Sequence, residues 1–148
     1  MLINGKITGI VLLVISLMGC GASKVLVTGK IQRVMGNQMP SPDLENEEPG
    51  GFSTTVFFFE PTLLNMGVST GEQGVFLMTN KKLVAKVLAE KDGSFKLKLK
   101  PGKYSVLLGK DSQYYSNISD MEGLINPVEI SKSNNKRITL RADWGAIY

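Results

Sequence analysis

Hydrophobic and polar residues alternate strictly over residues 94–100. Phe95, Leu97 and Leu99 take turns with serine and lysine residues, so one face of this segment is apolar and the other is charged. Successive side chains of a β-strand point to opposite faces of a sheet, whereas a helix repeats every 3.6 residues. The period of two therefore predicts a strand that is buried on one side only.

Strand-like patterns recur along the rest of the chain. The run of β-branched and aromatic residues at 54–59 is typical of a fully buried strand. Residues 82–90 also fit a helix, because Leu83, Lys86, Val87 and Glu90 recur at helical spacing, but helix caps are missing and a strand is favoured. The predicted strands are 24–34, 54–59, 75–79, 82–90, 94–100, the segment through Tyr104, Val106 and Leu108, 125–131 and 136–142.

Turn residues separate these strands. Asp92-Gly93, Pro101-Gly102 and residues 132–135 predict tight turns that join neighbouring strands as hairpins, and Asn80-Lys81 predicts a further turn. Prolines and glycines make loops of 36–53 and 60–74. The sequence thus predicts an all-β fold, an antiparallel Greek-key-type sandwich of about seven strands.

The amino terminus has the organisation of an export signal. Lys6 precedes the apolar run 7–17, which is shorter than the ~20 residues that a membrane-spanning helix needs, and we expect a helix over 7–18 in the precursor. A short buried helix, or a signal peptide cut by an ordinary peptidase, is the alternative. Leu17-Met18-Gly19-Cys20 resembles the lipobox of bacterial lipoproteins.

That resemblance implies cleavage between Gly19 and Cys20 and acylation of the Cys20 sulfur. The mature chain would then have 148 − 19 = 129 residues. The expected organisation is a signal peptide at 1–19, a lipidated end and short tether at 20–23, and the β-domain at 24–148. Because Gly21 is not the aspartate that favours inner-membrane retention, we expect the outer membrane, facing the periplasm, in a Gram-negative cell.

Three short motifs together resemble the carboxypeptidase regulatory-like domain, a transthyretin-like β-sandwich of bacterial exported proteins. They are Val27-x-Gly29-x-Ile31, Asp92-Gly93-x-Phe95 and Leu99-x-Pro101-Gly102-x-Tyr104-x-Val106. The resemblance covers roughly 24–142 and implies a module for folding, adhesion or protein contact, without catalytic residues. The segments 36–53 and 60–74 depart from the family's compact pattern.

Composition narrows the possible chemistry. The chain has no histidine, which excludes Ser-His-Asp and Cys-His catalysis and His-containing zinc sites, and its single cysteine cannot form an internal disulfide. A carboxylate-based hydrolase using Glu60, or Glu90 with Asp92, is an unfavoured alternative, since Asp92 already serves a turn. The carboxylates of the acidic run lack the spacing of a calcium loop, so we expect no metal and no cofactor; these are Asp43, Glu45, Glu47 and Glu48.

The positive charge is dispersed along the chain. The net charge is +4, or 4 − 1 = +3 once Lys6 is removed, and no nucleic-acid-binding motif accompanies it, so we expect no nucleic-acid partner. Lys96, Lys98 and Lys100 share one strand face about 6.8 Å apart. They form a candidate surface for an acidic ligand, but the favoured interpretation is that they keep an exposed strand soluble and discourage pairing at the sheet edge.

Aromatic residues near the carboxyl terminus offer a second candidate surface. Tyr114 and Tyr115, in an expected polar loop, could stack on a sugar or a partner, or cover the end of the sandwich. Trp144 could cap the core or dock elsewhere. The expected function is a membrane-anchored, non-catalytic module that contacts an envelope protein or supports the envelope, with carbohydrate or acidic-ligand binding as the alternative.

Overall fold

The computed structural model is an all-β protein. It describes residues 23–37, 49–66, 68–78, 81–133 and 137–147, which form ten strands and one turn of 3-10 helix, η1 (Leu64–Met66). The expected helix 7–18, Cys20 and the acidic run 43–48 lie outside these residues. The predicted fold class, all-β, is confirmed for the part that the structure describes.

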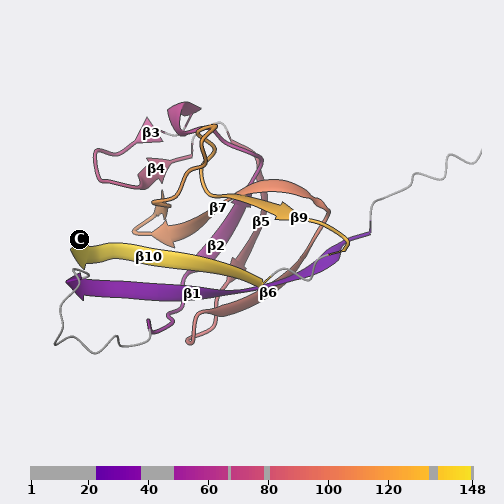
Figure 1. Cartoon of the computed structure of the whole chain (residues 1–148), viewed down its shortest axis with the longest axis horizontal. Coiled ribbons are helices and arrows are strands. Elements are labelled where there is room, and N and C mark those ends of the chain that lie inside the picture. The colour runs from indigo at the N-terminus through magenta and orange to yellow at the C-terminus, as the bar shows by residue number, and fades with distance from the viewer. Residues whose placement is uncertain (1–22, 38–48, 67, 79–80, 134–136, 148) are drawn as a thin grey trace, which may run out of the picture.

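Three strands form the smaller sheet, in the order β10-β1-β6. The first strand, β1 (Val25–Asn37), lies between β6 (Ser94–Leu99), which runs antiparallel to it, and β10 (Arg137–Ile147), which runs parallel. β10 lies beside β1 from Thr28 to Asn37, and the first residues of β1 extend beyond it (Figure 1). This parallel pairing of the first and last strands differs from the purely antiparallel arrangement that we expected.

The remaining strands form the larger sheet, in the order β3-β4-β8-β7-β2-β5. β7 is its central strand. One edge of β7 pairs with β2, and the other edge pairs with β9 over Gly102–Ser105 and with β8 over Leu108–Lys110. The strands of this sheet are β2 (Thr55–Phe59), β3 (Val68–Ser69), β4 (Val75–Leu77), β5 (Leu83–Leu88), β7 (Gly102–Lys110), β8 (Gln113–Tyr115) and β9 (Pro127–Ile130).

The inward faces of the two sheets share one hydrophobic core. Val27 and Ile31 on β1 pack in the same buried cluster as Val56 and Phe58 on β2 and Val106 on β7. In β6 the alternation predicted from the sequence is confirmed at the strand's ends, with Phe95 and Leu99 buried and the lysines between them exposed.

The turns predicted at Asp92-Gly93 and Pro101-Gly102 form, whereas Asn80 and residues 134–135 of the other two lie outside the described residues; the hairpins predicted around these turns are wrong. Asp92-Gly93 links β5 to β6 and Pro101-Gly102 links β6 to β7, yet β6 pairs only with β1, while β5 and β7 belong to the other sheet. Residues 131–136 likewise link β9 and β10 in different sheets. β4 pairs with β3 and β8, not with β5. A strand that is apolar on one face satisfies either arrangement, so the alternation alone cannot choose its partner.

A tight hairpin forms where a polar loop was expected. β7 and β8 are joined through Asp111 and Ser112, whose φ angles are 46° and 65°. Positive φ at both central residues is the geometry of a type I′ turn, which matches the twist of the flanking strands. Tyr114 and Tyr115 therefore belong to a strand.

The larger sheet has a second hydrophobic cluster on its outward face. It consists of the buried residues Phe59, Phe76, Leu107 and Ile125, with Phe57, Met78 and Tyr114 packed against them. The segments 60–78 and 116–126 supply η1, β3, β4 and two isolated β-bridges near this cluster, Leu63–Leu124 and Ser119–Ile125. The Gly-rich segment predicted as a loop thus contains short regular elements.

Candidate functional site

The outward face of the smaller sheet carries a grid of positive charge. The register places Lys98 beside Leu26, and Lys96 and Arg137 on either side of Thr28. The next outward positions on β1 are Lys30, which faces Ser94 and Thr139, and Gln32, which faces Arg141. The cationic members of this surface, here called the basic face, are Lys30, Lys96, Lys98, Arg137 and Arg141.

The basic face is open, and the one counter-charge recorded beside it is Asp92 in the turn before β6, whose carboxylate interacts with Lys30. Four of its cations are exposed and Lys30 is half-buried, and none of the outward positions on the three strands has a carboxylate. Among the described residues, the ion pairs within 4 Å involve other lysines, namely Lys82, Lys103 and Lys110. Neighbouring strands are about 4.8 Å apart and alternate residues about 6.8 Å apart, so the cations are spaced for a ligand with repeated anionic groups.

Sequence reasoning found only part of this face. Lys96 and Lys98 lie on it as expected, and Lys100 follows β6 as an exposed residue. The contributions of β1 and β10 were missed because strands far apart in the sequence supply them. The available signal was the strand phase: Lys30 and Arg141 both occupy the polar phase of alternating segments.

A β-bulge in β10 contributes to a second candidate site, a polar pocket. Ala142 pairs with Arg33 and Gly145 with Met35, so β10 advances three residues where β1 advances two. A bulge redirects side chains that would otherwise alternate between the two faces. Asp143 and Trp144 are consecutive, yet both line the same pocket of about 180 Å³. This polar pocket is lined by Glu72, Gln73, Tyr115, Asn117, Asp143, Trp144 and Ala146.

A buried carboxylate organises the floor of the polar pocket. Asp143 is only 6% exposed and accepts hydrogen bonds from the Tyr115 hydroxyl on Oδ1 and from Asn117 Nδ2 on Oδ2. Hydrogen bonds to an ionised acceptor are among the stronger ones in proteins, so this trio fixes the orientation of its side chains.

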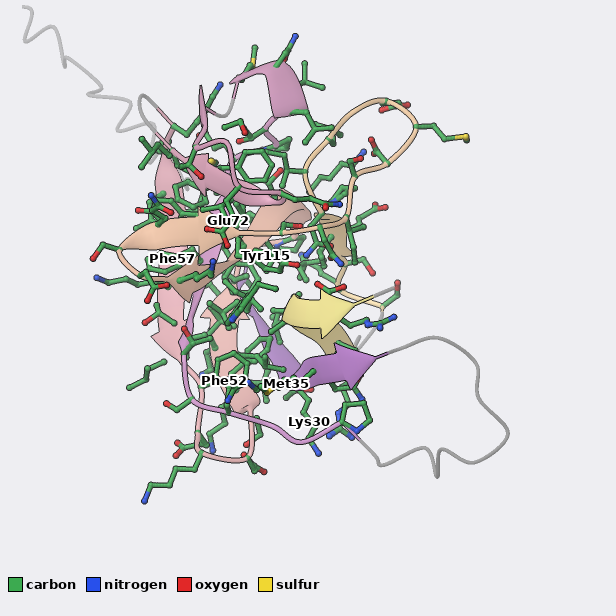
Figure 2. The ribbon with its side chains drawn as sticks, turned by 90° about the vertical axis from the view of Figure 1, so that its left-hand side faces the viewer. Lys30, Met35, Phe52, Phe57, Glu72 and Tyr115 are labelled. Carbon is green, nitrogen blue, oxygen red and sulfur yellow. The ribbon has the colours of Figure 1, made fainter. Side chains whose placement is uncertain are left out.

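Two of the lining residues, Glu72 and Trp144, are held by contacts with residues beside the pocket. Lys110 is paired with Glu72, and its Nζ lies 6.0 Å from the centroid of the Trp144 ring. Trp144 makes edge contacts with Tyr115 and Phe52, with ring centroids 4.8 and 5.6 Å apart. Glu72 and Tyr115 lie close together in Figure 2, and Phe52 lies farther along the same side.

The two tyrosines considered as a binding surface face opposite sides of β8. Tyr115 is buried and contributes to the polar pocket. Tyr114 packs edge-on against Phe57 and Phe59 at 4.9 and 5.2 Å between centroids, within the outer cluster. Trp144 packs on the core, which was one of its two expected roles, and it also lines the pocket.

The carboxylates considered for catalysis have structural contacts. Glu60 is ion-paired with Lys82 at 3.3 Å, and Asp92 Oδ1 accepts hydrogen bonds from the hydroxyl and backbone N–H of Ser94. Those hydrogen bonds hold the pKa of Asp92 below its ordinary value. Within the described ranges, no cluster of metal-ligating residues occurs and no helix is long and apolar enough to cross a membrane.

No family model matches the chain, and no curated protein matches it significantly.

Proposed function

We propose that this protein is a lipid-anchored, non-catalytic β-sandwich module of a bacterial cell envelope that binds an anionic ligand through its basic face. The observation that carries the proposal is the charge of that face, where three strands present five cations and no carboxylate. Like charges on adjacent strands oppose folding slightly, and Lys96, Lys98, Arg137 and Arg141 form no ion pair within 4 Å among the described residues, so a ligand gives them a role that stability does not.

The anchor is supported by the resemblance of Leu17-Met18-Gly19-Cys20 to a lipobox. Two or three acyl chains hold a protein stably on a membrane, whereas one chain anchors only marginally. Only four residues separate Cys20 from the start of β1 at Val25, so Lys24 and the neighbouring Lys98 and Lys100 would lie close to the anchor. The ligand class that follows is a phosphate- or carboxylate-bearing polymer or headgroup near the membrane surface.

The binding proposal is tested by retention of the detergent-solubilised protein on phosphocellulose. Replacing Lys96 and Lys98 by Gln should lower the salt concentration at which the protein elutes. With fewer lysine contacts to phosphate, fewer counterions are released on binding, and the affinity falls. The matched control replaces Lys86 and Lys132, two exposed lysines outside the basic face, and removes the same charge. Equal effects of the two pairs would overturn the proposal.

The source of the anion is resolved by two further measurements. Phosphatidylglycerol vesicles and soluble polyphosphate present the same chemistry in a membrane and in solution. Competition by polyphosphate for phosphocellulose indicates a soluble polymer, whereas preferential binding to phosphatidylglycerol over phosphatidylcholine vesicles indicates a headgroup. Contact with a neutral surface of another envelope protein predicts salt-insensitive binding instead, and that result would contradict the basic-face proposal.

The anchor is tested separately by mass spectrometry of the purified protein. We expect a chain that begins at Cys20 and carries the added mass of acyl groups, while a Cys20→Ala variant should remain uncleaved and unacylated. An unmodified chain that still begins at Met1 would overturn the anchor without affecting the basic face.

A further inference from the structure

The polar pocket combines an aromatic side chain with several accessible polar groups. Trp144 is half-buried, and its indole N–H has no hydrogen-bond partner among the described residues. The same holds for the amide of Gln73 and for Oδ1 of Asn117, whose Nδ2 donates to Asp143. Because these three residues line the pocket, their unused polar groups are the candidates for hydrogen bonds to a ligand there.

We propose that this pocket binds one ring of a neutral saccharide. Sugar hydroxyls both donate and accept hydrogen bonds, which suits the mixed set of groups from Trp144, Gln73 and Asn117. The C–H face of a sugar ring is apolar and can pack on an aromatic side chain whose polar edge remains available. This site is separate from the basic face and does not depend on the lipid anchor.

Charge distinguishes this ligand from the one proposed for the basic face. The pocket contains the carboxylates of Glu72 and Asp143, and the adjacent Lys110 is already paired with Glu72. An anion would meet an unfavourable potential there. A cation would have to compete with hydrogen bonds that Asp143 already accepts from Tyr115 and Asn117. A neutral ligand avoids both costs.

The size and rigidity of the pocket suit a single small ring. The volume of about 180 Å³ is below the ~300–1,000 Å³ of pockets that enclose drug-sized molecules. The bulge, the buried Asp143 and its two donors hold the floor in place before a ligand arrives. Such preorganisation reduces the entropy lost on binding.

The chain contains its own reporter for this site, because Trp144 is its single tryptophan. The protein in detergent is titrated with glucose, galactose, mannose and N-acetylglucosamine while tryptophan fluorescence is recorded. For at least one sugar we expect a saturable change with a dissociation constant of about 1–10 mM, as suits a small ligand with few contacts.

Two variants test whether the signal comes from the pocket. Gln73→Ala removes an exposed amide and should weaken binding about tenfold, the loss of roughly one hydrogen bond. Ala146→Leu should block the pocket and abolish the response while circular dichroism still shows a folded protein. The Lys96→Gln, Lys98→Gln pair serves as the control and should bind sugar normally.

Several results would overturn the proposal. They are the absence of a saturable response to every sugar up to about 100 mM, well above the weakest affinity expected, and unchanged binding in both pocket variants. Loss of sugar binding in the basic-face pair would also contradict a separate site. A failure of phosphocellulose retention, by contrast, bears only on the basic face, so the two proposals can fail independently.

Discussion

The outward faces of the two sheets differ in what lies over them. On the larger sheet, Phe59 and Leu107 are at most 2% exposed because a second cluster and its connecting segments cover them. On the smaller sheet, Leu26 is 49% exposed among lysines and arginines. A sheet buried on both faces requires consecutive apolar residues, as in β2, whereas a sheet with one open face requires alternation, as in β6.

The comparison predicts unequal costs for removing apolar side chains from the two outward faces. Phe59→Ala should lower the free energy of unfolding by about 3–5 kcal/mol, because it opens a cavity in a packed cluster. Leu26→Ala on the basic face should change it by less than about 0.5 kcal/mol. Urea denaturation measures both. Similar losses for the two variants would show that the outer cluster is not a second core.

The next largest change in the free energy of unfolding should come from the turn at Gly93, which connects β5 in the larger sheet to β6 in the smaller sheet. Gly93 has a φ of +82°, and a Cβ there would lie 2.3 Å from the carbonyl oxygen of Ile31. That position also ties the turn to β1, since the N–H of Ile31 donates to the Gly93 carbonyl at 2.8 Å. Gly93→Ala should therefore cost about 2–3 kcal/mol by urea denaturation.

Gly50 provides the matched control for this substitution. A Cβ at Gly50 meets nothing within 4 Å and its φ is not positive, although its carbonyl also accepts a hydrogen bond from β1, at Arg33. Gly50→Ala should leave stability unchanged or slightly raised. A mild effect at Gly93 would show that the turn between the sheets relaxes easily.

The sequence predicts strands and turns well because their signals are local. Alternation in 94–100 and the residues Asp92-Gly93 lie within a few positions of one another, and both outcomes follow from pleat geometry and backbone sterics. Partners could not be predicted in this way. A strand with one apolar face can bury that face in either sheet. The pairing of β6 with β1 therefore depends on the packing of the whole chain.

The same distinction between local and long-range signals applies to the candidate sites. Lys96 and Lys98 were found because a single strand shows their phase, whereas Arg137 and Arg141 join them only through a parallel pairing of distant strands. The polar pocket needed a bulge to bring Asp143 and Trp144 together. The sequence carries no local sign of this, because apolar and polar residues keep alternating through Ala142, Asp143 and Trp144, and only the structure shows Ala142 and Asp143 buried in succession.

Tyr104 should give an effect of about 1 kcal/mol, typical of one hydrogen bond. Its hydroxyl donates to the Lys100 carbonyl at 2.7 Å across Pro101-Gly102, the second link between the sheets. Burial raises the pKa of Tyr104 above its ordinary value near 10.0, so the unfolded chain loses the phenol proton first as pH rises. Stability contributed by the neutral phenol is therefore complete below pH 10 and decreases above it.

Tyr104→Phe is measured by urea denaturation at neutral and alkaline pH. The variant should lose stability at neutral pH and show a smaller alkaline decrease than the wild-type protein. Equal alkaline decreases in both proteins would assign that loss to other groups.

The smallest effect should come from the basic face, and its sign is informative. Lys96 and Arg137 lie two strand spacings apart, about 10 Å, which is comparable to the Debye length at ~0.1 M salt. Replacing both by Gln relieves their repulsion and should stabilise the protein by a few tenths of a kcal/mol at low salt, and less at high salt. Urea denaturation at two ionic strengths measures this, with Lys86→Gln, Lys132→Gln as the control for net charge. A gain specific to the face means that its cations oppose folding and are explained by a ligand. A loss would mean that they stabilise the sheet, and would remove the main support for anion binding.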